Sequence, residues 1–134
     1  PDADRLAVAE KQASSGKWHV FSGNEIGTLL GAWMIEKSKA KTGGGRKATL
    51  ASIVSSRMLK TMSEANDVEY YDTLTGFKWL GNRAIDLRAE GVDVLFAYEE
   101  ALGKFCEIYF SVICEYIYIH TYIHTHTHTN TYII

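Results

Sequence analysis

The sequence lacks several features that mark nucleic-acid-binding, membrane or secreted proteins. With 14 Lys and Arg against 16 Asp and Glu, it has no basic excess with which to bind a polyanion. Its longest strongly apolar stretch, residues 105–119, is too short to span a bilayer and carries two glutamates. No cationic segment followed by an apolar run opens the chain. We therefore expect a soluble, cytoplasmic protein with no nucleic-acid or membrane partner.

Cysteine and proline are also scarce. The two cysteines, Cys106 and Cys114, lack the spacing of a zinc site and do not form a disulfide framework, so they indicate no redox compartment. Pro1 is the only proline. At 134 residues and 46% hydrophobic composition, the chain can build one domain with a core and is hardly long enough for two.

Residues 106–134 differ in composition from the rest of the chain. They contain no Lys, Arg, Gly or Pro, but hold four of the five histidines and five of the eight tyrosines. From Tyr116 onward Tyr alternates with Ile and then His with Thr, as in translated TA and CA repeats. We interpret residues 106–134 as a low-complexity tail that arises by read-through of non-coding sequence, and residues 1–105 as the folded domain.

The tail histidines allow a second interpretation. They alternate along the chain and would share one face of a strand, where they could bind a metal: His120, His124, His126 and His128. Low complexity with incidental affinity for divalent metals is the interpretation we favour.

Residues 1–105 alternate between strand and helix patterns. Strand patterns cover residues 5–10, 18–21, 48–54, 68–74 and 92–97. Helical patterns begin after Ser22, cover residues 58–65 and run from Phe77 to a stop at Gly91; residues 37–47 are expected to form a loop. Ser22 and Glu25 have the spacing of a capping box. The pattern predicts an α/β layered domain with a largely parallel sheet covered by helices.

Two loops of this predicted domain fall where ligands collect, at the carboxyl ends of parallel strands. They are residues 75–78 and residues 98–103. At the start of the chain, Asp2 and Asp4 stand at alternate positions before a strand, a spacing that suits a hard cation such as Mg²⁺. A solvated acidic terminus is the alternative reading of these two residues.

Four segments in the right order resemble domain 3 of the α-D-phosphohexomutase family, which includes phosphoglucomutases and phosphomannomutases. Pro1-Asp2-Ala3-Asp4-Arg5 is similar to the end of the family's metal loop, and Gly23-Asn24-Glu25-Ile26-Gly27 to the start of the next helix. Thr75-Gly76-Phe77-Lys78-Trp79-Leu80-Gly81-Asn82 and Glu99-Glu100-Ala101-Leu102-Gly103 are similar to two loops at the substrate site. The resemblance covers residues 1–104.

The resemblance implies roles for individual residues. Asp2 and Asp4 would be ligands of Mg²⁺, and Arg5 would face the substrate phosphate. Thr75, Gly76, Glu99 and Ala101 would bind the sugar, with Glu99 accepting hydrogen bonds from two hydroxyls. Ala101 stands where many phosphoglucomutases have serine, as in the phosphoglucomutase-2 branch, which also takes pentose phosphates. We assign Asn24 and Glu25 to helix capping ahead of substrate contact, and leave structural roles open for Lys78 and Glu100.

The implied function is intramolecular phosphoryl transfer that interconverts sugar 1-phosphates with glucose 6-phosphate or ribose 5-phosphate. Its partners would be glucose 1-phosphate or ribose 1-phosphate, a sugar bisphosphate, and the remaining domains of a longer enzyme. No serine loop and no phosphate-clamping fourth domain are found in the sequence, so we expect a fragment that is inactive alone. The alternative is a non-catalytic α/β module that binds a divalent cation or a sugar phosphate.

Overall fold

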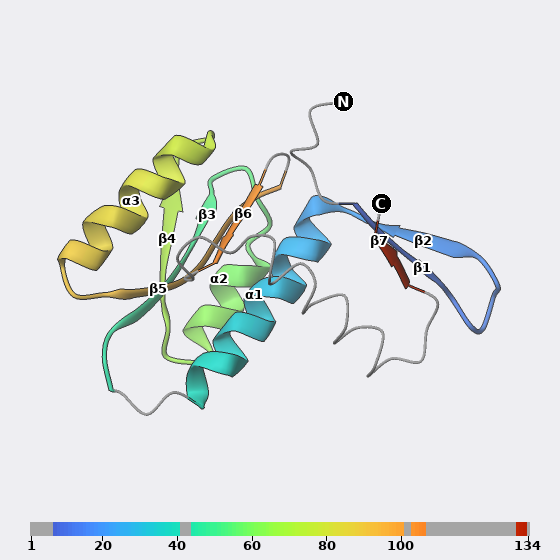
Figure 1. Cartoon of the computed structure of the whole chain (residues 1–134), viewed down its shortest axis with the longest axis horizontal. Coiled ribbons are helices and arrows are strands. Elements are labelled where there is room, and N and C mark those ends of the chain that lie inside the picture. Colours follow the sequence, from blue (N-terminus) through green and yellow to red (C-terminus); the bar gives the residue numbers. More distant parts are fainter. Residues whose placement is uncertain (1–6, 41–43, 101–102, 107–130, 134) are drawn as a thin grey trace.

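A computed structural model describes residues 7–40, 44–100, 103–106 and 131–133. Seven strands and three helices occur in these ranges (Figure 1). In chain order they are β1 (Val8–Lys11), β2 (Trp18–Phe21), α1 (Gly23–Lys39), β3 (Lys47–Ser52), α2 (Met58–Glu64), β4 (Glu69–Thr73), α3 (Phe77–Ala89), β5 (Asp93–Glu99), β6 (Gly103–Cys106) and β7 (Thr131–Ile133).

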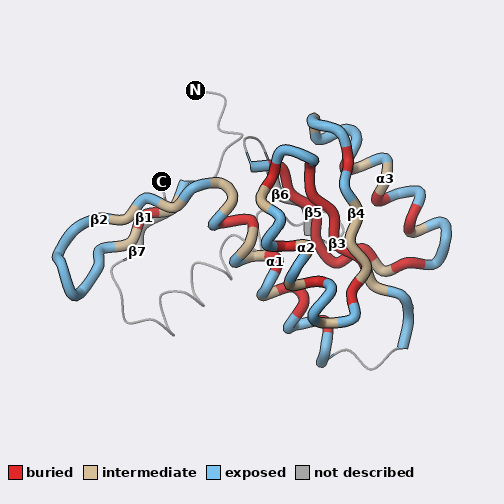
Figure 2. The backbone as a smooth tube through the Cα atoms, turned by 180° about the vertical axis from the view of Figure 1, so that it is seen from behind, coloured by how far each residue is buried: buried red, intermediate tan, exposed pale blue. Residues whose placement is uncertain are grey.

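The main sheet has the strand order β4-β3-β5-β6. Strands β3, β4 and β5 are parallel, and β6 pairs antiparallel with β5. Helices α1 and α2 cover one face of the sheet and α3 covers the other, so that the buried strands lie between two helical layers (Figures 1 and 2). The expected α/β architecture with a largely parallel, helix-covered sheet is confirmed.

Two apolar clusters hold these layers together. On the α3 face, Ala48 and Leu50 of β3 pack with three residues of α3 at helical spacing, namely Leu80, Ala84 and Leu87. On the opposite face, α1 and α2 contribute Met34, Ile35 and Leu59. Because both faces of the sheet are covered, β3 and β5 are buried along nearly their whole length and do not alternate between buried and exposed residues.

A β-bulge lies between β3 and β5. Ala48 pairs with Val94 and Thr49 pairs with Phe96, which leaves Leu95 without a partner in the ladder. Leu95 and Phe96 therefore both join the cluster under α1 and α2, although they are consecutive in the chain.

The capping box at the start of α1 forms as expected. The Ser22 N–H donates to Glu25 Oε2 at 2.7 Å, and the Glu25 N–H donates to Ser22 Oγ at 3.2 Å. The backbone and side-chain hydrogen bonds from Ser22 lower the pKa of Glu25 below its ordinary value. The expected loop over residues 37–47 is wrong at both ends, since α1 continues to Lys39 and β3 begins at Lys47. Ser38 lies in this last turn of α1, where it is buried and donates its hydroxyl hydrogen to the Ile35 carbonyl, 2.7 Å away.

The first two strands, which the sequence predicted, pair with each other antiparallel and belong to a second sheet. This sheet has the order β2-β1-β7, with antiparallel pairing throughout, and lies beyond the start of α1, which separates it from the main sheet (Figure 1). Strand β7 comes from the segment that we assigned to the tail, and Ala9 of β1 pairs with Tyr132.

The expected loop over residues 98–103 also needs correction. Strand β5 extends through Tyr98 and Glu99, because these two residues pair with Lys104 and Gly103 of β6. The sequence did not predict β6, since a four-residue strand following a short turn leaves little periodic signal. No helix in the described ranges is long and apolar enough to cross a membrane.

Candidate functional site

The carboxyl ends of β3, β4 and β5 meet at one edge of the main sheet. The central contact at this edge joins the last residue of β5 to the loop after β4. The Gly76 N–H lies 3.2 Å from each of the two Glu99 carboxylate oxygens and donates to them. Only 5% of Glu99 is exposed. The two loops that the sequence placed at the ligand edge are therefore in direct contact.

Gly76 can make this contact because of its backbone conformation. Its φ is 106°, a value that other residues rarely adopt. Gly76 also caps α3, whose first turn begins with the hydrogen bond from the Trp79 N–H to the Gly76 carbonyl at 2.9 Å. Thr75, next to it, is exposed at the same edge.

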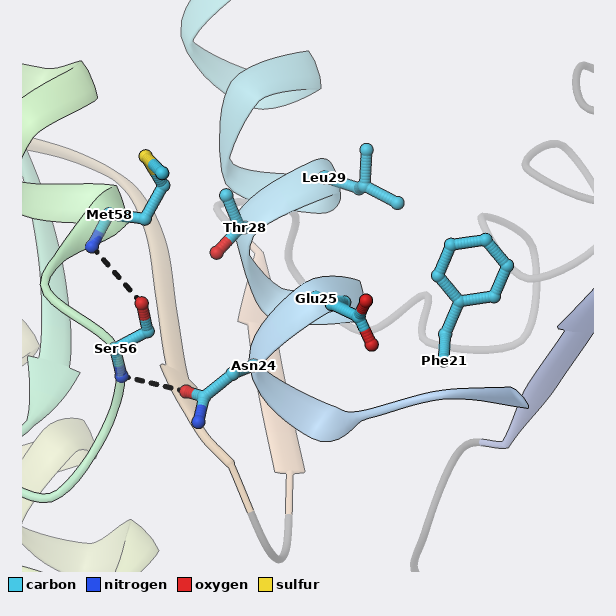
Figure 3. A pocket seen from close by; sticks show the side chains of 7 residues that line it. All are labelled: Phe21, Asn24, Glu25, Thr28, Leu29, Ser56 and Met58. Atoms are coloured by element: carbon cyan, nitrogen blue, oxygen red, sulfur yellow. Dashed lines mark hydrogen bonds between the residues drawn. The ribbon is translucent and has the colours of Figure 1, made fainter. Parts of the chain in front are cut away.

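Asn24 connects three further segments at this edge. Its Nδ2 donates to Glu100 Oε2 at 2.7 Å, and its Oδ1 accepts from the Ser56 N–H, also at 2.7 Å. The Tyr98 hydroxyl lies 3.2 Å from the same Oδ1 and 3.4 Å from the Ser56 carbonyl. Burial raises the pKa of this hydroxyl. Figure 3 shows Asn24 pointing from the first turn of α1 toward Ser56, in the loop between β3 and α2.

The start of α1 approaches β5 closely. A Cβ on Gly23 would lie 1.9 Å from the Glu100 carbonyl oxygen, and a Cβ on Gly27 would lie 2.3 Å from the Tyr98 ring. Both distances are shorter than any van der Waals contact, so these two positions require glycine. The close approach brings Asn24 within hydrogen-bonding distance of Glu100.

An open pocket of about 370 Å³ lies beside Asn24 (Figure 3). Its walls come from the end of β2, the first two turns of α1, the β3–α2 loop and the start of α2. The lining residues are Phe21, Asn24, Glu25, Thr28, Leu29, Ser56 and Met58. Within this pocket the Ser56 N–H donates to Asn24 Oδ1, so these two polar groups satisfy each other. The rest of the lining is mainly apolar.

Arg57 supplies a positive charge at the same edge. Its Nη1 lies 2.6 and 2.7 Å from the two carboxylate oxygens of Asp72 in β4. Partial burial acts to raise the pKa of Asp72, but the hydrogen bonds from Arg57 and Tyr70 outweigh it and lower that pKa. The pair fixes the β3–α2 loop against β4.

Several predicted site residues lie outside the described residues. These are Asp2, Asp4, Arg5 and Ala101, together with the four tail histidines. Within the part of the chain that the structure describes, no group of three or more His, Cys, Asp or Glu side chains is placed to hold a metal ion. Thr75, Gly76 and Glu99 are the predicted site residues that the structure places at one edge.

The assignment of Asn24 and Glu25 to helix capping is right for Glu25, which completes the capping box. Asn24 instead joins segments that are distant in the chain, since Ser56 and Glu100 are 32 and 76 residues away. No local pattern signals such contacts. Glu100 has a structural contact, because its carboxylate accepts a hydrogen bond from Asn24. The Lys78 ammonium lies 5.3 Å from the centre of the Trp79 ring.

A largely parallel sheet between two helical layers, with polar side chains at its carboxyl edge, defines a layered α/β domain. Residues 22–112 match the family model for phosphoglucomutase/phosphomannomutase, alpha/beta/alpha domain III. The chain belongs to this family.

Relatives in several organisms share this segment. The chain is 51% identical over 110 residues to the human phosphopentomutase, covering 79% of this chain and 18% of that protein. It is 46% identical over 109 residues to the mouse glucose 1,6-bisphosphate synthase, covering 79% of this chain and 17% of that protein. It is 48% identical over 107 residues to the phosphoribomutase of Saccharomyces cerevisiae, covering 77% of this chain and 17% of that protein. The chain thus spans less than a fifth of the length of these relatives.

A solved structure has the same fold. The apo form of N-acetylglucosamine-phosphate mutase, a member of the α-D-phosphohexomutase superfamily, superposes with a TM-score of 0.57 at 18% sequence identity. The match covers 77% of this chain and 20% of that one.

Proposed function

We propose that this chain supplies the sugar-recognition domain of a sugar-phosphate mutase, an isomerase that moves a phosphoryl group within pentose and hexose phosphates. The observation that carries the proposal is the contact between Glu99 and the Gly76 N–H, which joins the two loops that resemble the family's substrate site. The relatives named phosphopentomutase and phosphoribomutase support this substrate class.

Glu99 has the hydrogen-bonding capacity that sugar recognition requires. An ionised carboxylate offers about four lone-pair sites on two oxygens. Among the described residues, Gly76 supplies one N–H that is shared between both oxygens, which leaves acceptor sites for two sugar hydroxyls. Thr75, exposed beside Gly76, would line the same site, as would Ala101.

We assign the binding of the substrate phosphate and of Mg²⁺ to residues at the start of the chain. Asp2 and Asp4 offer carboxylates, which are the ligands that Mg²⁺ prefers, so the donor set fits this ion. The Arg5 guanidinium suits phosphate oxygens. Bound Mg²⁺ would neutralise charge on the transferred phosphoryl group.

Other domains of the enzyme would cover the carboxyl edge. Three apolar side chains in the loops at this edge are more than half exposed, namely Ile53, Val54 and Leu74. Apolar side chains that gather at a substrate edge suit contact with a second domain. The serine that carries the phosphoryl group between its two transfers would belong to such a domain.

The proposal can be tested by replacing the matching segment of the human phosphopentomutase with residues 22–106 of this chain. We expect the chimera to retain mutase activity with ribose 1-phosphate. Adding Glu99→Gln should remove most of that activity, whereas Glu36→Gln, an exposed change on α1 away from the edge, should not. A folded chimera that binds ribose 1-phosphate without turnover would instead favour the non-catalytic module.

A further inference from the structure

The end of β5 is anchored on two sides by consecutive carboxylates. Glu99 accepts from Gly76, in the loop before α3, and Glu100 accepts from Asn24, in the first turn of α1. Glu99 is the last residue of β5 and Glu100 follows it in a turn, and the two side chains reach different neighbours. The position of Glu99 therefore depends on both contacts, since the two residues share one peptide bond.

The contacts of Asn24 are directional. Its amide uses the donor group for Glu100 and the acceptor oxygen for the Ser56 N–H and the Tyr98 hydroxyl. A side chain with only acceptors or only donors cannot satisfy all of these partners. The glycines at positions 23 and 27 bring α1 close enough to β5 for this arrangement, because any larger residue would collide with Glu100 or Tyr98.

From this network we infer that Asn24 is a positioning residue for sugar recognition: by holding Glu100, it fixes the end of β5 and so the Glu99 carboxylate. That Glu99 binds a sugar rests on the proposed function, whereas the positioning of Glu99 by Asn24 rests on the hydrogen bonds. Asn24 acts through Glu100 and need not touch the substrate. It is also distinct from the helix cap, which Ser22 and Glu25 provide without it.

In the Asn24–Glu100 hydrogen bond Asn24 is the donor and Glu100 the acceptor, and a pair of substitutions can exchange these two roles. Asn24→Asp places a second carboxylate against Glu100 and removes the donor, so the two groups repel. The double variant Asn24→Asp/Glu100→Gln restores one donor and one acceptor in the reverse direction, while the carboxylate introduced at position 24 can still accept from the Ser56 N–H. A merely structural loss at residue 24 would not be repaired by a change at residue 100.

The first measurement uses the complete 134-residue chain and follows amide hydrogen exchange at Gly76 by NMR. Asn24→Asp should displace Glu99 through Glu100 and so weaken the bond from the Gly76 N–H to the Glu99 carboxylate. Exchange at this amide should then accelerate by about 10- to 100-fold, the range expected when a hydrogen bond to a charged group is lost. The double variant should return it to near the wild-type rate. Ser22→Ala, which weakens the same end of α1 but leaves the Asn24–Glu100 bond in place, should not produce a selective change at Gly76.

The second measurement uses the chimera with the human phosphopentomutase and ribose 1-phosphate. Asn24→Asp should raise KM by about 10-fold with a smaller effect on kcat, because binding is lost in both the ground state and the transition state. The double variant should recover KM. Unchanged Gly76 exchange and unchanged KM in Asn24→Asp, or no recovery in the double variant, would overturn the inference. An inactive parent chimera would reject the proposed function, and the exchange rates would still decide whether Asn24 positions β5.

Discussion

Glu99 is unusual among the charged residues of the described chain because it is almost completely buried. A carboxylate in such a place requires hydrogen-bond donors, and the structure supplies the Gly76 N–H. That donor comes from a backbone whose φ of 106° suits glycine alone. Glu99 and Gly76 are therefore coupled, and a change in either one affects both loops of the edge.

The first prediction concerns Glu99→Gln in the active chimera. Losing a carboxylate that accepts two sugar hydroxyls costs about 2–4 kcal/mol, or roughly 30- to 1000-fold in kcat/KM. The loss should appear with both glucose 1-phosphate and ribose 1-phosphate, while Mg²⁺ affinity stays nearly constant, since the chimera takes the segment before residue 22, with the positions that correspond to Asp2 and Asp4, from the human enzyme. Steady-state kinetics and a Mg²⁺ titration measure the two quantities. Full activity, or a defect mainly in metal binding, would refute the assignment of Glu99 to the sugar.

The second prediction concerns acid stability and Glu69. Arg46 holds this carboxylate with two hydrogen bonds, Nε to Oε1 at 2.7 Å and Nη2 to Oε2 at 2.9 Å. These bonds, together with the one from Tyr71, lower the pKa of Glu69 to about 2. Its ordinary pKa is 4.5, so the unfolded chain binds the proton first as pH falls.

The contribution of Glu69 to stability is therefore complete above about pH 5 and is lost between about pH 5 and pH 2. Glu69→Gln should flatten the dependence of unfolding free energy on pH in this window, by a modest amount because the pair is partly exposed. Urea unfolding at several pH values provides the measurement. The same acid slope in wild type and variant would show that the Arg46–Glu69 pair does not contribute.

Helix α1 organises the site at the level of secondary structure. It starts at a capping box, and its glycines Gly23, Gly27 and Gly31 lie at four-residue intervals on the side that meets β5 and α2. A Cβ at Gly31 would lie 2.5 Å from Leu59 Cδ1 of α2. Glycine normally weakens a helix, so its repetition here reflects the close packing of α1 on its neighbours.

The third prediction compares two glycines in helices. Gly27→Ala places a Cβ 2.3 Å from the Tyr98 ring and should destabilise the fold by about 1–3 kcal/mol, as overpacked cores do. Gly81→Ala in α3 is the matched control, because nothing lies within 4 Å of its added Cβ. The control should stabilise the fold by about 0.5–1 kcal/mol. Chemical denaturation measures both, and an equal gain in both variants would contradict the close approach of α1 to β5.

At the scale of the whole molecule, the carboxyl edge combines a buried carboxylate with exposed apolar loops. Ile53, Val54 and Leu74 are exposed in the loops that follow β3 and β4, and the Ile53 N–H donates to the Thr73 carbonyl at 2.9 Å. The relatives are more than five times as long as the segment they share with this chain. An edge of this kind suits a domain that works together with others.

The fourth prediction follows for the isolated chain. Purified alone, the 134-residue protein should show no mutase activity with glucose 1-phosphate or ribose 1-phosphate, even with Mg²⁺ and a sugar bisphosphate. The reason is that these 134 residues contain no serine loop of the family's kind, and without a nucleophile nothing holds the phosphoryl group between transfers. Turnover in a coupled assay that Asp4→Ala abolishes would overturn this expectation.

Local patterns were sufficient for the elements whose causes are local. The start of α1 follows from Ser22 and Glu25, which lie three residues apart, and the buried face of α3 follows from the spacing of Leu80, Ala84 and Leu87. Patterns failed where a distant partner decided the outcome. Tyr98 and Glu99 became strand residues because β6 pairs with them, and the bulge at Leu95 depends on its register with β3.

The sequence by itself determined the α/β class, the family resemblance and the placement of two loops at one edge of the sheet. These conclusions depend on periodicity and on short motifs, which act over a few residues. Only the tertiary structure decided that Glu99 is buried against Gly76 and that Asn24 connects Ser56 with Glu100. The physical reason is that these hydrogen bonds join residues 23 to 76 positions apart, and such pairs meet only after the sheet and its helices have packed.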